Sequence, residues 1–285
     1  MRFFVTGGVG YLGRVVIRHA VLAGYTVGAS YFSAPPDPDE RIIWAPLDVR
    51  DSIAVEETLD QFAPDVVIHT AFRQSGADLM ATTADGAGYV AHAAAAIGAR
   101  LIHMSSDVIF DGEHVGAYTE DDPPAPISPY GEAKAQAEAL VMAIHPDAAI
   151  VRTSLIYGFN PIDRQTRFAV EIASGERNDR LFQDEYRCPI YVEDLAAALV
   201  ELAAIEYRGV LHIAGAEAVS RYELGELMAR ACGYDPAHIP AGLSAESPIP
   251  RPRNCVLAIS RAGRLLQTRL RGVREVLRDL GRPVE

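Results

Sequence analysis

The segment Thr6-Gly7-Gly8-Val9-Gly10-Tyr11-Leu12-Gly13 lies between an apolar stretch and a helical pattern at the start of the chain. The apolar residues of Arg2–Val5 predict a strand, and the spacing of apolar residues over 15–22 predicts a helix. A glycine-rich turn between a strand and a helix is the context in which such a motif binds a dinucleotide.

Three of the four glycines in this segment have a physical role in such a motif. Gly7 allows the tight turn, Gly10 lets a pyrophosphate approach the backbone, and Gly13 lets the helix pack closely on the sheet. The N-terminus of the helix then offers free N–H groups and a partial positive charge to the phosphates. The segment therefore predicts the pyrophosphate site of a dinucleotide cofactor.

The second strand, Thr26–Phe32, ends without the acidic residue that an NAD-preferring site usually carries for the ribose 2′-OH. Ser30 and Tyr31 stand there instead, and the first acid is Asp37. Because no carboxylate repels a 2′-phosphate, NADP is the expected cofactor. No arginine stands at the strand end either, so NAD remains open.

A third strand, Ile42–Leu47, ends at Asp48 and Val49. Asp48 has two interpretations: its carboxylate accepts a hydrogen bond from the adenine amino group, or it caps a helix over Ile53–Phe62. His69 lies in the apolar strand that follows, and we interpret it as a core histidine with its hydrogen bonds satisfied.

A second chemical grouping lies in the middle of the chain. The stretch Arg100–Met104 predicts a buried strand that ends in two serines, and the helix expected over residues 129–141 carries Tyr130 and Lys134. Residues four apart share one helix face. A cation beside a phenol lowers its pKa from about 10, so the phenol can exchange a proton with an alcohol or carbonyl oxygen. Ser106 can stabilise that oxygen. Taken alone, Tyr130 and Lys134 could also be an ordinary surface pair.

Strands alternate with helices over the first part of the chain, which predicts an α/β fold with a doubly wound parallel sheet of the Rossmann type and a small C-terminal substrate-binding lobe. We expect residues 1–158 to form the NAD(P)-binding domain with the Ser, Tyr and Lys of the active site. Residues 159–285 are expected to form a mixed substrate-binding region, with some segments returning to the first domain.

Arginines gather in the irregular part of the chain between residues 159 and 187. They are Arg164, Arg167, Arg177, Arg180 and Arg187. Arg251 and Arg253 form a second basic point around Pro252. In an acidic protein, such a local excess is a candidate grip for a sugar diphosphate. Solvated surface charge is the alternative for any one of them.

Composition limits the class of protein further. The 285 residues are 49% apolar and carry a net charge of −12, which argues against a nucleic-acid partner and against an anionic membrane surface. No apolar run approaches the ~20 residues of a membrane span, and the N-terminus enters a strand without a secretory signal. The three cysteines, Cys188, Cys232 and Cys255, show no metal-ligand spacing. We expect a cytoplasmic enzyme without a metal site.

Taken together, these motifs resemble the extended short-chain dehydrogenase/reductase superfamily in order and spacing. More closely, the chain resembles the dTDP-4-dehydrorhamnose reductase family over nearly its whole length. The segments that carry this resemblance are Pro64–Ile68, Ser105–Gly112, Pro129–Glu138, Val151–Gly158, Gly209–Gly215 and Arg251–Leu257. The chain departs from the family at His69-Thr70-Ala71-Phe72-Arg73, where the reductases usually carry asparagine and alanine.

The resemblance implies a reductase that acts on the C4 ketone of a nucleotide-activated deoxysugar, with hydride from the nicotinamide. Tyr130 would donate the proton, Lys134 would lower the phenol pKa and hold the nicotinamide ribose, and Ser106 would hold the reacting oxygen. The cofactor-binding residues implied are Gly7, Gly10, Tyr11, Leu12, Gly13, Ser30, Tyr31, Asp48, Val49, Ala71, Phe72, Arg73, Tyr130, Lys134 and Tyr157. The substrate-binding residues implied are Ser106, Asp107, Arg187 and Arg251.

Two other functions remain open. An epimerase or dehydratase on the same fold would retain its NAD without net consumption of cofactor. A branch that resembles this reductase family serves as a regulatory subunit of methionine adenosyltransferase and binds NADP without obvious turnover; the Ser106, Tyr130 and Lys134 set argues against such a purely binding role. A homodimer is expected only by analogy with the superfamily.

Overall fold

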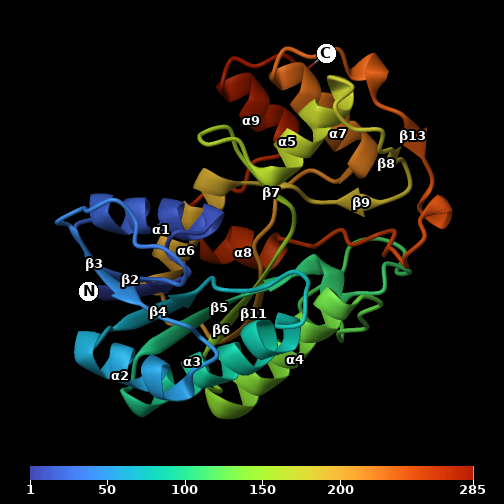
Figure 1. The fold of residues 1–285 in the computed structure, drawn as a ribbon. Helices are drawn as coiled ribbons and strands as arrows, with labels where there is room; N and C mark the ends of the chain where they lie inside the picture. Colours follow the sequence, from blue (N-terminus) through green and yellow to red (C-terminus); the bar gives the residue numbers. More distant parts are fainter. Residues whose placement is uncertain (285) are drawn as a thin grey trace. The chain divides into compact units, whose positions relative to one another are not determined.

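A computed structural model describes residues 1–284 of the protein (Figure 1). The chain divides into two compact units. The first unit consists of Met1–Ser106, Pro129–Arg152 and Ala196–Leu211, and the second of Asp107–Ser128, Thr153–Leu195 and His212–Glu285. The expected assignment of residues 1–158 to the cofactor and 159–285 to the substrate stays a prediction.

The first unit is built on a seven-stranded sheet in the order β11-β6-β5-β4-β1-β2-β3. Its strands are β1 (Arg2–Thr6), β2 (Thr26–Tyr31), β3 (Ile42–Pro46), β4 (Val66–His69), β5 (Arg100–Ser106), β6 (Ala149–Thr153) and β11 (Gly209–His212). The pairings of β1 with β2 and β4, of β2 with β3, and of β4 with β5 are parallel. The Rossmann-type α/β fold predicted from the alternating pattern is confirmed.

Helices cover both faces of this sheet (Figure 1). They are α1 (Tyr11–Leu22), α2 (Ser52–Phe62), α3 (Gly86–Ala96) after a π-helical turn (Ala81–Asp85), α4 (Pro129–Ile144) and the later part of α6 (Val192–Ala203). Helix α1 lies on one face, whereas α2, α3 and α4 lie on the other. Phe4, Val67 and Leu101 of the sheet pack on that second face against residues of α2 to α4, which forms a continuous apolar core.

The second unit contains mainly short elements. They are a 3₁₀ turn (Asp107–Ile109), β7 (Ile156–Tyr157), α5 (Arg164–Ala173), β8 (Leu181–Phe182), β9 (Tyr186–Arg187), β10 (Ile190–Tyr191), β12 (Val219–Ser220), α7 (Arg221–Ala231), a 3₁₀ turn (Pro236–His238), β13 (Ala241–Gly242), a 3₁₀ turn (Ser244–Glu246), α8 (Ser260–Leu265) and α9 (Val273–Asp279). Ser220 and Glu223 form a capping box at the start of α7, so the predicted cap is confirmed. Residues of α5, α7 and α9 share one apolar core.

One alternative for Asp48 is wrong. Asp51, not Asp48, caps α2, because its carboxylate accepts hydrogen bonds from the backbone N–H groups of Ile53 and Ala54. The Asp48 carboxylate is instead paired with Arg50. No helix in residues 1–284 combines the length and the apolar character that a membrane crossing needs.

Candidate active site

The glycine-rich turn has the geometry that its sequence predicts. Gly7 has a left-handed backbone with φ +66°, and its N–H donates to the Ser30 hydroxyl at 3.1 Å. A Cβ on Gly13 would lie 2.3 Å from the Gly7 carbonyl oxygen, so no side chain fits there. The turn therefore holds α1 close to the sheet, which is the arrangement that the sequence predicts for this motif.

A cavity of about 350 Å³ opens beside this turn in the first unit. It brings together eight of the residues implied as cofactor-binding: Gly7, Gly10, Ser30, Asp48, Val49, Ala71, Phe72 and Arg73. Tyr11, Leu12 and Gly13 begin α1 and Tyr31 ends β2, and none of the four lines the cavity. Phe32, Ser33 and Arg50 line it in addition.

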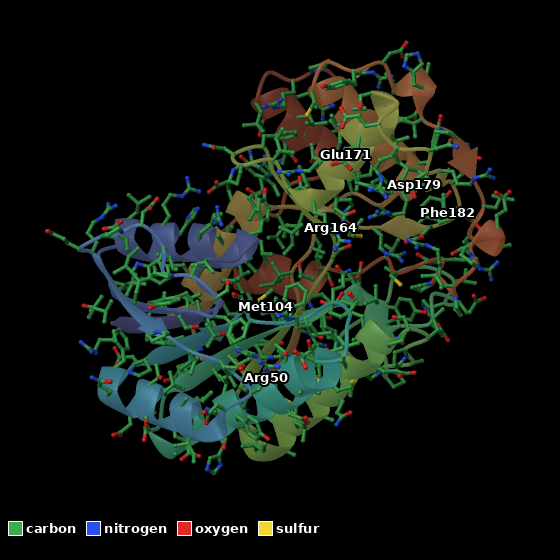
Figure 2. All side chains as sticks on the ribbon, in the orientation of Figure 1. Arg50, Met104, Arg164, Glu171, Asp179 and Phe182 are labelled. Carbon is green, nitrogen blue, oxygen red and sulfur yellow. The ribbon has the colours of Figure 1, made fainter. Side chains whose placement is uncertain are left out.

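Tyr130 and Lys134 lie on the first turns of α4, and Ser106 ends the neighbouring β5. The Lys134 side chain is only 4% exposed, and its ammonium donates to the Met104 carbonyl at 2.8 Å. Figure 2 labels Met104 on β5. The lysine is therefore a fixed charge inside the unit and not one half of an ordinary surface pair.

Phe72 of the cavity contacts both side chains of this helix. Its ring centroid lies 5.8 Å from that of Tyr130 and 5.1 Å from the Lys134 Nζ. The second distance is that of a cation–π contact. Phe72 is half exposed, so its ring forms a wall shared by the cavity and the Tyr130–Lys134 pair.

Burial lowers the pKa values of Lys134 and of two histidines in the neighbouring strands. Burial lowers the pKa of Lys134 to about 8, and the Glu138 carboxylate opposes this shift. His69 and His103 are neighbours across β4 and β5, with ring centroids 5.4 Å apart. Burial lowers the pKa of His69 to about 3 and that of His103 well below its usual range. Both imidazoles are therefore neutral at physiological pH.

The interpretation of His69 as a core histidine is confirmed for its burial and for one of its two nitrogens. Its Nδ1 lies 2.7 Å from the Thr6 hydroxyl. Its Nε2, like both ring nitrogens of His103, has no hydrogen-bond partner among residues 1–284. A structured water is the usual partner of such atoms.

Three of the four residues implied for the substrate, Asp107, Arg187 and Arg251, meet in an ion-pair cluster of the second unit, whereas Ser106 ends β5 in the first unit. Arg187 is 2% exposed and lies 3.0 Å from Glu185 and 3.6 Å from Asp107. The Asp107 carboxylate also accepts a hydrogen bond from Ser154 at 2.6 Å. Arg251 forms two hydrogen bonds to Glu185 and keeps part of its side chain exposed.

The other sequence candidates of the second unit have different surroundings. Tyr157 is fully buried in the apolar core, where burial raises its pKa. Arg177 pairs with Asp179, and Arg180 pairs with Glu246, on the exposed surface. Surface charge is thus the interpretation that the structure favours for these two arginines.

A family model described as "RmlD substrate binding domain" matches residues 1–284. The chain belongs to this RmlD family. It is 33% identical over 271 residues to a dTDP-4-dehydrorhamnose reductase of Mycobacterium tuberculosis, which covers 91% of this chain and 84% of the relative. It is 29% identical over 282 residues to methionine adenosyltransferase 2 subunit beta of Mus musculus, which covers 91% of this chain and 81% of the relative.

Among solved structures, the RmlD-family chain is similar to a hypothetical dTDP-4-dehydrorhamnose reductase from Sulfolobus tokodaii, with 27% identity and a TM-score of 0.82. The alignment covers 96% of this chain and 97% of the other. The resemblance to the reductase family, stated from the motifs, is confirmed.

Two arginines of this RmlD-family protein, Arg50 and Arg221, are not among the site residues predicted from the sequence. Arg50 reaches the cavity from the residues after β3, and the spacing Asp48-x-Arg50 is its only signal in the sequence. Arg221 begins α7, is partly buried, and donates to the Gln165 side chain at 2.8 Å. Nothing in the local pattern distinguishes Arg221 from an ordinary residue after a helix cap.

Proposed function

We propose that the protein is an NAD(P)H-dependent reductase of the C4 ketone of a nucleotide-activated deoxysugar, similar to the dTDP-4-dehydrorhamnose reductases. The observation that carries this proposal is the buried Lys134 ammonium on the same helix face as Tyr130, beside a cavity shaped by the glycine turn. Burial of a cation costs free energy, and groups whose pKa is shifted in this way cluster at functional sites.

The cavity fits a dinucleotide. The N–H groups of the turn and of the first turn of α1 would hold the pyrophosphate, and Ser30 with Asp48 would flank the adenosine. A bound reduced nicotinamide would supply the hydride. Lys134 would lower the pKa of the Tyr130 phenol, Tyr130 would donate its proton to the ketone oxygen, and Ser106 would hold that oxygen.

Arginines of the second unit would bind the sugar diphosphate. Its cluster sets the guanidinium groups of Arg187, Arg221 and Arg251 against two carboxylates, those of Glu185 and Asp107. The excess of positive charge suits a diphosphate in a protein whose net charge is −12. Arg187 is enclosed by its partners, so Arg251 and Arg221 are the residues that would reach the substrate, whereas Arg187 and Asp107 would support them.

The test is an absorbance assay at the reduced-nicotinamide band with dTDP-4-keto-6-deoxyhexose and NADPH or NADH. Tyr130→Phe is expected to lower kcat by about 10²-fold or more, because a general acid contributes about 10² to 10⁴. Tyr234→Phe, a change at an exposed tyrosine, is the matched control and should retain turnover. Full turnover by Tyr130→Phe would contradict the assigned mechanism.

The same assay addresses the two other functions. The relative in Mus musculus that is a subunit of methionine adenosyltransferase keeps the regulatory function in view, but the reductase relatives and the buried Lys134 do not favour it. Tight cofactor binding without consumption would move the proposal to an epimerase or a regulatory subunit.

A cytoplasmic location and a homodimer also stay predictions. The chain alone should elute as a dimer in size-exclusion chromatography, without any larger partner protein.

A further inference from the structure

The end of β2 is where a Rossmann cofactor places its adenosine ribose. In this chain the residues there are Phe32 and Ser33, and both line the cavity. The nearest acid in the sequence is Asp37, which does not line the cavity. The segment after β2 therefore does not supply the carboxylate that binds a free 2′-OH in an NAD site and repels a 2′-phosphate.

Arg50 brings a guanidinium to this position from the next strand. Its Cζ lies 5.5 Å from the centroid of the Phe32 ring, which is a cation–π distance. Figure 2 labels Arg50 on the first unit. The arginine that the sequence lacks after β2 is thus supplied by the segment after β3.

Two carboxylates hold this guanidinium in place. The Asp48 carboxylate accepts hydrogen bonds from Nε at 2.9 Å and from one terminal nitrogen at 2.6 Å, and Asp78 pairs with the other terminal nitrogen at 2.8 Å. These contacts use three of the five N–H bonds of a guanidinium. Two N–H bonds remain outside the ion pairs that Arg50 makes with Asp48 and Asp78.

The charge around this end of the cavity is balanced, whereas the protein as a whole is negative. Arg50 and Arg73 balance Asp48 and Asp78 around this end of the cavity, in a chain whose net charge is −12. A fixed guanidinium with unused N–H bonds is the side chain best suited to bind a phosphate through a fork of hydrogen bonds.

We propose that Arg50 is the residue that selects NADP over NAD, by donating to the 2′-phosphate at the end of β2. The proposal rests on the proposed function only in that the cavity holds the dinucleotide. Asp48 and Asp78 act as positioning residues, because they orient the guanidinium above the Phe32 ring.

The experiment compares two small probes of the adenosine end, adenosine 2′,5′-bisphosphate and 5′-AMP, by titration calorimetry on the full chain. The wild-type protein should bind the bisphosphate at least about 10-fold more tightly, since hydrogen bonds to a charged group correspond to roughly 10- to 100-fold in affinity. Arg50→Gln should remove this preference and change the affinity for 5′-AMP by less than about 3-fold.

Arg41 offers a matched control at the other end of β3. It pairs with Asp39 in the same Asp-x-Arg arrangement, at 2.9 and 2.7 Å, and does not line the cavity. Arg41→Gln should leave the preference for the bisphosphate unchanged. Arg50→Lys, which keeps the charge but loses the fork, should keep a reduced preference and serves if Arg50→Gln does not fold.

An unchanged ratio of the two affinities in Arg50→Gln, or equal affinities in the wild-type protein, would overturn the proposal. An equal loss of both affinities would also overturn it, because Arg50 would then act only by holding Asp48. Failure of the proposed reductase activity is seen separately, in the sugar-nucleotide assay, and does not change the binding ratio. If neither probe binds, both the proposal and the assignment of the cavity to a dinucleotide are wrong.

Discussion

Burial of Lys134 affects the chemistry proposed for this protein, because it lowers the pKa of the proposed activating group. Its ammonium is enclosed, donates to the Met104 carbonyl, and faces the Phe72 ring. Tyr130, Glu138 and two neutral histidines are the titratable groups around it. Burial disfavours the charged form of a lysine, so the group that would activate the phenol is itself close to losing its proton.

This proximity gives a pH prediction. Because the pKa of Lys134 is lowered to about 8, the free protein loses this charge as the pH rises through about 8, and kcat/KM for NADPH should fall above that pH. An arginine stays protonated in this range. In Lys134→Arg, the remaining activity should therefore lose this alkaline limb. The measurement is kcat/KM from pH 6 to 10, and the same limb in both proteins would show that another group titrates.

At the scale of elements, the turn between β1 and α1 depends on the absence of side chains. A Cβ on Gly13 would meet the Gly7 carbonyl oxygen at 2.3 Å and the Gly8 Cα at 3.0 Å, and both are backbone atoms. Backbone cannot rotate away as a side chain can, so the helix would have to move from the sheet.

Gly13→Ala should therefore destabilise the protein by about 1 to 3 kcal/mol, as overpacking of a well-packed site does. Gly263, in α8, is the control, because nothing lies within 4 Å of a Cβ built there. Gly263→Ala should stabilise the protein by roughly 0.5 to 1 kcal/mol through helix propensity. Urea unfolding measures both changes, and a destabilisation of equal size in the two variants would contradict the role of close packing.

The regular elements could be predicted because their patterns are local. The strands and helices around the glycine turn, and the capping box at Ser220, follow from periodicity and cap chemistry. The sequence makes Asp48 a candidate cap of α2 although Asp51 has that role, because both are aspartates before one helix and only the hydrogen bonds distinguish them. The two-residue strands β8 to β10 lie below the length that a sequence pattern can reveal.

In the candidate site, too, local motifs could be identified from the sequence, but positions that depend on tertiary contacts could not. The residues of the turn and the Tyr130–Lys134 spacing are local motifs, whereas the location of Arg50 above the Phe32 ring depends on strands β2 and β3 lying side by side. The enclosure of Arg187 could not be foreseen either, because it depends on Glu185, Asp107 and the Pro252 carbonyl from three parts of the chain. Motifs report which residues can act, and tertiary contacts decide which of them remain accessible.

At the scale of the whole molecule, buried neutral histidines make the folded state sensitive to acid. His103 is fully buried, and its pKa lies well below 6.5 because burial disfavours the imidazolium. Burial also lowers the pKa of His69, to about 3. In the unfolded chain both would titrate near 6.5. Between pH 6.5 and 3 the unfolded state therefore binds more protons, and the free energy of unfolding falls as the pH falls.

Each such histidine removes about 1.4 kcal/mol of stability per pH unit below 6.5. Between pH 7 and pH 5, His103→Leu should therefore lose about 2 kcal/mol less stability than the wild-type protein, whatever its stability at pH 7. His92→Gln is the control for loss of a histidine outside the core, because the His92 side chain is 65% exposed. Denaturant unfolding at several pH values gives the slopes. If His103→Leu had the wild-type slope, His103 would already be protonated or solvated in the folded protein. The assignment of His103 as a buried neutral imidazole would then be wrong.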